Sequence, residues 1–104
     1  MNNYRVFLTQ RALKDLENIS AYISDKLGSH VAAVNLEIKL TEAAPSLKEN
    51  PYRAPKFSEE YNLIPEKDIR KLIVDNYLIL YYVEESQKVV QVVTIYNRLM
   101  KVFK

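Results

Sequence analysis

The chain has 104 residues, of which 48% are hydrophobic and 27% are charged, and its formal net charge is +2. This length and composition predict a single soluble domain over residues 1–104 and exclude a low-complexity chain. The chain has no cysteine, which excludes a disulfide framework and thiol chemistry and favours a cytoplasmic location.

The N-terminal half of the chain predicts one strand followed by two helices. Apolar and polar residues alternate over residues 4–8, as in a short strand, and Thr9 can cap the helix that follows. Gly28, the only glycine, stands where that helix needs a left-handed C-cap, and Pro45 must kink or end the second helix near Ala44. The apolar residues at helical spacing are Ala12, Leu16, Ile19, Ile23 and Leu27, then Ala33, Leu36, Leu40, Ala43 and Leu47. We expect an antiparallel helical hairpin with facing apolar stripes.

Residues 50–68 contain three prolines among charged and aromatic residues, and this composition predicts a long loop with a short helical turn at about residues 58–62. Such a loop is either functional or a packed connection held by Tyr52, Phe57 and Tyr61. Three strands follow, over residues 69–74, 77–83 and 88–97, with turns at residues 75–76 and 85–87. The predicted order is β-α-α-β-β-β, an α+β fold with the hairpin packed on a mostly antiparallel four-stranded sheet.

The two-residue turn predicts which side chains share a face of the sheet. Val74 should lie opposite Tyr77, Leu72 opposite Ile79 and Arg70 opposite Tyr81, on the face that meets the helices. The other face then carries Ile69, Lys71, Ile73, Leu78, Leu80 and Tyr82. In the last strand, strict alternation puts Val90, Val92, Thr94, Tyr96 and Arg98 on one face and Val89, Gln91, Val93, Ile95 and Asn97 on the other. A sheet face this apolar suggests a partner protein as its cover, and the alternative is a solvated face with ordinary surface cations.

Several classes of site have little support. The single histidine, His30, has no cysteine beside it, so we expect no metal site and no cofactor. The acidic pairs at residues 59–60 and 84–85 fall in predicted loops, where we expect them to supply solubility rather than paired-carboxylate catalysis. The longest apolar run, residues 78–83, is too short to cross a membrane, and the mild positive charge permits a nucleic-acid partner without requiring one.

Four segments together resemble the RelE/ParE superfamily, the toxins of bacterial type II toxin–antitoxin pairs. They are "TQRALKDLENISAYISDKLGSHVAAV", "SLKENP", "IRKLIVDNYLILYYVEE" and "VVQVVTIYNR", and the resemblance covers nearly the whole chain. It implies a toxin of an addiction or plasmid-stabilisation module, which arrests growth and is silenced by a small cognate antitoxin. Operator DNA would then be bound only through the antitoxin.

One branch of the superfamily, the RelE-like members, implies a metal-independent endoribonuclease (mRNA interferase) that cuts mRNA on the ribosome. Such chemistry needs cations around the phosphate and groups that move protons. The resemblance puts Lys71 on a basic position and Arg98 on the closing arginine. Tyr96 could supply a proton, and the favoured alternative for it is an aromatic side chain at a strand end, packed at an edge. However, Leu78 stands where an arginine is expected, and Phe103 stands at the C-terminal tyrosine position. Arg70 or Lys101 would have to substitute.

The other branch, the ParE-like members, implies a toxin that binds DNA gyrase without needing that arginine. The helical hairpin and Leu78 favour this branch, so we expect a binding protein rather than an enzyme. The expected contacts with the target or the antitoxin are Arg70, Ile73, Leu78, Leu80, Tyr82, Lys101 and Phe103. A third possibility is a decayed toxin that retains only antitoxin binding.

Overall fold

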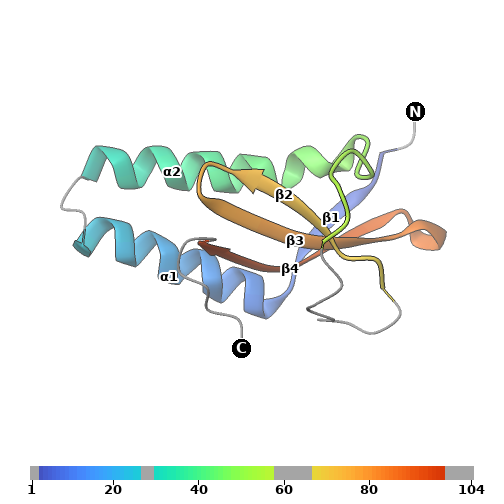
Figure 1. Cartoon of the computed structure of the whole chain (residues 1–104), viewed down its shortest axis with the longest axis horizontal. Helices are drawn as coiled ribbons and strands as arrows, with labels where there is room; N and C mark the ends of the chain where they lie inside the picture. Colours follow the sequence, from blue (N-terminus) through green and yellow to red (C-terminus); the bar gives the residue numbers. More distant parts are fainter. Residues whose placement is uncertain (1–2, 27–29, 58–66, 98–104) are drawn as a thin grey trace.

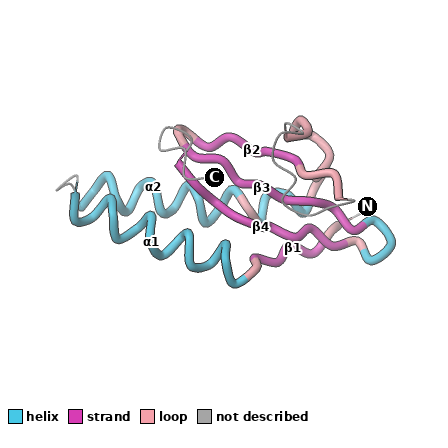
Figure 2. Tube along the Cα trace, turned by 60° about the horizontal axis from the view of Figure 1, so that its bottom comes forward, coloured by secondary structure: helices cyan, strands magenta, loops and turns pink. Residues whose placement is uncertain are grey.

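The computed structural model describes residues 3–26, 30–57 and 67–97 (Figure 1). Its elements are β1 (Arg5–Leu8), α1 (Gln10–Lys26), α2 (His30–Ala43), the short 3-10 helix η1 (Pro45–Lys48), β2 (Arg70–Val74), β3 (Tyr77–Glu84), the 3-10 turn η2 (Glu85–Gln87) and β4 (Val89–Asn97). The two helices lie side by side on one face of the sheet, and the hairpin extends beyond the sheet at the end where α1 leads into α2 (Figures 1 and 2). This arrangement confirms the predicted α+β fold.

The sheet has the strand order β1-β4-β3-β2. β1 runs parallel to β4, whereas the β4–β3 and β3–β2 pairs are antiparallel. The three predicted pairs, Val74 with Tyr77, Leu72 with Ile79 and Arg70 with Tyr81, are confirmed. Asp75 takes a left-handed conformation with φ of 54°, which a two-residue hairpin turn requires and an aspartate tolerates.

Local signals at the helix ends also act as predicted. The Thr9 hydroxyl accepts a hydrogen bond from the Ala12 amide at 3.1 Å and donates to the Val93 carbonyl at 2.9 Å, so it caps α1 and ties it to β4. α2 ends at Ala43, two residues before Pro45. The predicted Gly28 cap and the predicted turn at residues 58–62 lie outside the described residues. Within the described part of the chain, no helix is both long and apolar enough to cross a membrane.

The main core lies between the helices and the sheet. Its members with no more than 2% exposure are Ala12, Leu40, Ala44, Leu47, Ile79, Tyr81, Val90, Val92 and Ile95. The Tyr81 hydroxyl is buried with its ring and donates to the Pro51 carbonyl at 2.6 Å, which satisfies a polar group that would otherwise destabilise the core.

A β-bulge in β4 overturns one prediction. Leu80 pairs with Thr94 but the next residue, Tyr81, pairs with Val92, so Val93 is the extra residue. The bulge breaks the strict alternation, and Val92 and Ile95 therefore face the same core. The prediction that Val90, Val92, Thr94 and Tyr96 share one face of β4 was wrong for this reason. On α1, the Asp15 carboxylate accepts hydrogen bonds from the Thr94 hydroxyl and, at 3.1 Å, from the Ile95 amide beside the bulge.

Candidate binding surface on the outer face of the sheet

The helices leave one face of the sheet, the outer face, turned away from them (Figure 2). A second apolar cluster lies on this outer face. This outer cluster consists of the buried Ile69, Leu78, Leu80 and Val93, with Phe57, Tyr82 and Tyr96 packed against them. Leu80 is 0% and Leu78 is 8% exposed. The expectation that this face is open until a partner covers it was therefore wrong for these two leucines, because the chain buries them itself.

Phe57 reaches the outer cluster because residues 50–57, the strap, pair with the edge of β2. The Phe57 amide donates to the Ile69 carbonyl at 2.7 Å, and the Lys71 amide donates to the Pro55 carbonyl at 3.0 Å. These bonds protect part of the β2 edge, which would otherwise expose unpaired backbone groups. Of the two interpretations of this loop, its described part fits the packed connection.

Arg70 anchors the strap rather than serving the outer face. Its guanidinium donates to the Ala54 carbonyl at 2.7 Å and to the Tyr52 carbonyl at 3.3 Å, and it lies 5.1 Å from the centre of the Tyr52 ring. Arg70 also pairs with Tyr81, whose ring is in the main core, whereas its neighbour Lys71 pairs with Leu80 of the outer cluster. Arg70 is therefore poorly placed to help Lys71 hold a phosphate.

The remaining predicted site residues are spread over the outer face. Lys71 and Tyr96 are half-buried, and Ile73 is 51% exposed. Lys71 lies in the row of Leu80, whereas Tyr96 lies two residues along, in the row of Leu78. Lys71 is on β2 and Tyr96 is on β4, with β3 between them. Two interstrand spacings across the sheet and two residues along it separate the two backbones by about 12 Å. Arg98, Lys101 and Phe103 lie outside the described residues, and the binding roles of all these residues stay predictions.

Leu78, the residue after Tyr77, is buried in the outer cluster. Its cross-strand partners are Ile73 on β2 and Tyr96 on β4. A hydrocarbon at this point can neither hold a phosphate nor move a proton. The described part of the outer face thus combines apolar side chains with the Lys71 side chain.

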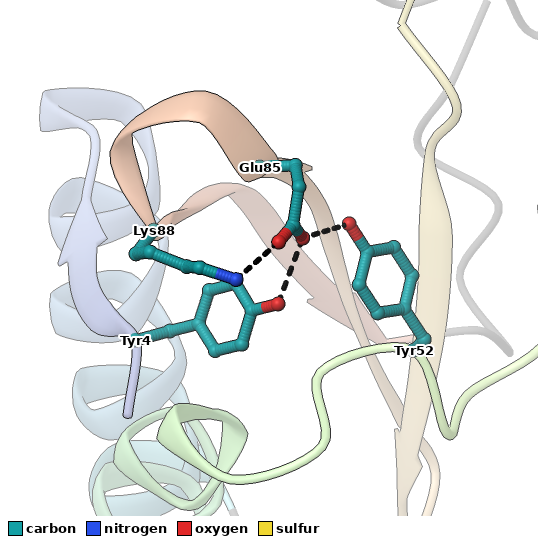
Figure 3. Close-up of polar contacts among 4 residues, drawn as sticks. All are labelled: Tyr4, Tyr52, Glu85 and Lys88. Carbon is teal, nitrogen blue, oxygen red and sulfur yellow. Dashed lines mark hydrogen bonds and ion pairs between the residues drawn. The ribbon is translucent and has the colours of Figure 1, made fainter. Parts of the chain in front are cut away.

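A polar cluster lies at the turn between β3 and β4 (Figure 3). The sequence did not predict it. One oxygen of Glu85 accepts hydrogen bonds from the hydroxyls of Tyr4 at 2.7 Å and Tyr52 at 2.6 Å, and the other pairs with Lys88. Glu85 therefore ties together the chain before β1, the strap and the β3–β4 turn. Residues 84–85 were expected to supply solubility rather than paired-carboxylate catalysis, and the structure adds a structural role, since Glu84 also pairs with Lys67. Only the i, i+3 spacing of Glu85 and Lys88 could have signalled this cluster.

The electrostatics of the polar cluster indicate a structural role. The hydrogen bond from Lys88, followed by those from the two tyrosines, lowers the pKa of Glu85 to about 2. The bond to Glu85 raises the pKa of Tyr52 to about 12. At neutral pH the carboxylate is too weak a base, and the hydroxyl too weak an acid, for proton transfer.

A polar cavity of about 260 Å³ adjoins this cluster. It is lined by Tyr52, Lys67, Asp68, Arg70, Val83, Glu84 and Glu85. Lys67 pairs with Glu84, and Arg70 is bound to the strap. The described lining of the cavity therefore lacks the excess of positive charge that a phosphate site needs. Among the described residues, no three His, Cys, Asp or Glu side chains are grouped so that they could hold a metal ion.

Three solved structures share this fold. A chain of the chromosomal ParDE system from Pseudomonas aeruginosa superposes with a TM-score of 0.69 at 19% identity, over 93% of this chain and 98% of that one. The archaeal RelE–RelB complex from Pyrococcus horikoshii gives 0.63 at 17% identity, over 94% and 97% of the two chains. The RelBE2 toxin–antitoxin complex from Mycobacterium tuberculosis gives 0.62 at 19% identity, over 92% and 99%. At these identities the likeness shows the fold.

No curated protein shows a significant match to the chain. The family is shown instead by the match of the sequence to a family model. The family model described as the ParE toxin of the type II toxin–antitoxin system parDE matches residues 6–102, which is nearly the whole length. This match confirms the resemblance to the RelE/ParE superfamily, and the chain belongs to the ParE toxin family of type II toxin–antitoxin systems.

Proposed function

We propose that this toxin arrests growth by binding DNA gyrase in the cytoplasm and that it works without catalysis. The observation that carries the proposal is Leu78, which is buried in the outer cluster where the ribonuclease branch is expected to need an arginine. Loss of one preorganised transition-state donor typically costs about 100- to 1000-fold in rate. The match to the ParE family model also supports the gyrase branch.

The proposed antitoxin contact is the part of the outer face that the chain leaves accessible. Ile73 is 51% exposed, and the half-buried Tyr82 and Lys71 lie on the same face. A cognate antitoxin segment with aliphatic and acidic side chains would cover Ile73 and pair with Lys71. In keeping with this, the solved relatives include a ParDE system and complexes of RelE with RelB.

A supercoiling assay with purified gyrase and purified toxin tests the proposal. We expect loss of supercoiling and accumulation of cleaved DNA, both reversed by stoichiometric antitoxin. Induced expression in bacteria should stop DNA synthesis before protein synthesis. Normal supercoiling at a large excess of toxin would exclude the gyrase function, and the absence of any growth defect would favour a decayed toxin.

The second candidate is a RelE-like endoribonuclease, which is favoured by the position of Lys71 and Tyr96 on one face. Lys71→Ala tests it, with Lys14→Ala as the matched control because Lys14 is exposed on α1. If the toxin is a nuclease that uses Lys71, mRNA cleavage in a translating extract should fall about 100-fold in the first variant and stay unchanged in the second. Intact mRNA with the wild-type toxin would remove this candidate.

A further inference from the structure

The helical hairpin overhangs one end of the sheet, where α1 and α2 continue beyond the strands (Figure 1). A hollow of about 240 Å³ lies between α1 and the end of β4. A second hollow of about 380 Å³ lies between the hairpin and the β2–β3 turn. Tyr22, Tyr77 and Asn97 line both hollows. The two hollows therefore adjoin, and together they form the end groove.

The helical wall of the end groove is largely apolar. Tyr22 on α1 lines the groove and is 43% exposed. Ile19 lines the first hollow and Leu36 the second, and both side chains are half-buried. An apolar segment that lies in the groove would therefore remove aromatic and aliphatic surface from water.

The end groove also contains two carboxylates. Asp75 lines the second hollow and pairs with Lys39 at 3.1 Å. Asp15 lines the first hollow, where it accepts hydrogen bonds from the Thr94 hydroxyl and the Ile95 amide, and both of these donors are uncharged. Within the described part of the chain, Asp15 forms no ion pair. The first hollow therefore favours a segment that carries positive charge.

The residues that follow β4 have this combination of properties. β4 ends at Asn97, which lines both hollows, so residue 98 follows directly at the groove. Residues 98–104, the tail, read RLMKVFK, with four apolar residues, three basic residues and no acidic residue. Extended, the tail can span about 25 Å. The stretch of α1 from Asp15 to Tyr22 is only about 10 Å long, so the tail is long enough to line it.

We propose that the tail lies in the end groove, with its apolar side chains against Ile19, Tyr22 and Leu36 and a basic side chain beside Asp15. Little contact area is needed, because attachment to β4 gives the tail an effective concentration of about 1 mM at the groove. A contact with an intermolecular dissociation constant of about 0.1 mM would then keep the groove filled about ten times as often as empty.

This position separates the tail from the outer face of the sheet. Tyr77 and Ile95 line the groove and belong to the main core, on the helix side of the sheet. Lys71 pairs with Leu80 of the outer cluster, on the opposite side. Lys101 would therefore not join Lys71 around a phosphate. The proposal concerns the free toxin and does not depend on whether gyrase or the ribosome is the target.

A nitroxide label tests the position of the tail directly, because the chain has no cysteine of its own. A label on Lys104→Cys in the free toxin should broaden the amide NMR signals of Asn18 and Tyr22 on α1. It should leave the signal of Ile73, on the outer face, unchanged. Broadening of Ile73, or none at Asn18 and Tyr22, would overturn the proposal.

Limited digestion with trypsin tests the groove itself. Tyr22→Asp should speed cleavage after Lys101 about tenfold, because cleavage requires the tail to leave the groove. Leu13→Asp is the matched control, since Leu13 is 49% exposed on the same helix and lies opposite Tyr22 at about 100° per residue. The control should be cleaved at the wild-type rate. Equal rates in the wild type and Tyr22→Asp, or the same acceleration in both variants, would overturn the proposal.

Discussion

Leu80→Ala tests whether the outer cluster is a true second core. Leu80 is 0% exposed and packs with Ile69, Leu78 and Val93. Truncation removes three buried carbon groups, worth about 0.8 kcal/mol each on transfer to water. The cavity left between the sheet and Phe57 adds to this loss, so we expect a decrease in the free energy of unfolding of about 3–4 kcal/mol. Since small domains have about 5–15 kcal/mol in total, this is a large fraction of the stability.

Urea denaturation followed by circular dichroism measures this change. Ile73→Ala is the matched control, because it lies on the same face but is 51% exposed, and it should cost about 1 kcal/mol. The slope of the unfolding free energy against urea should be the same in both variants, so that the midpoint alone moves. A loss below about 1 kcal/mol in Leu80→Ala, or equal losses in the two variants, would refute the second core and restore an open docking face.

Three further variants test single contacts. Asp15→Ala removes the acceptor of the Ile95 amide beside the bulge and should lower the free energy of unfolding in urea by about 1–3 kcal/mol. Thr9→Ala removes the cap of α1 and should cost about 1 kcal/mol in the same assay. In Glu85→Gln, thermal melts over a pH series should show less acid sensitivity than in the wild type. The pKa of Glu85 in the folded chain is about 2, below its ordinary 4.5, so its contribution is complete above pH 4.5 and is lost as the pH falls towards 2.

Exposed positions supply the controls for these variants. Glu17→Ala on α1 and Glu49→Gln beside η1 should leave stability unchanged within about 0.5 kcal/mol. An Asp15→Ala variant as stable as Glu17→Ala would mean that water replaces the carboxylate at the bulge. Parallel pH profiles of the wild type and Glu85→Gln would contradict the lowered pKa of Glu85.

Features that depend on neighbours in the chain were predicted well. The two-residue turn at Asp75 determines the β2–β3 register, because only one pairing closes so short a hairpin. Thr9 and Pro45 mark helix ends through the backbone groups of their own turn. The family resemblance rests on the same kind of signal, the spacing of short segments, and the family match confirms it.

Features that depend on distant residues could not be predicted in this way. The bulge at Val93 leaves no mark in a run of β-branched residues, and its stabilising acceptor, Asp15, lies 80 residues from Ile95 in the chain. The carboxylate of Glu85 accepts hydrogen bonds from Tyr4 and Tyr52, which are both far from it in the sequence. The alternation of polar and apolar residues could not show that Leu78 and Leu80 are covered.

The sequence alone determined the order of the elements, the hairpin register and the family, because turns, caps and periodicity act over a few residues. Tertiary structure decided which face of β4 enters each core, that the strap places Phe57 on the outer cluster, and that Arg70 anchors the strap. It also formed the end groove between the helical hairpin and the sheet. The physical reason is that burial and hydrogen bonding depend on which segments meet in space, and the local pattern of the chain does not specify those meetings.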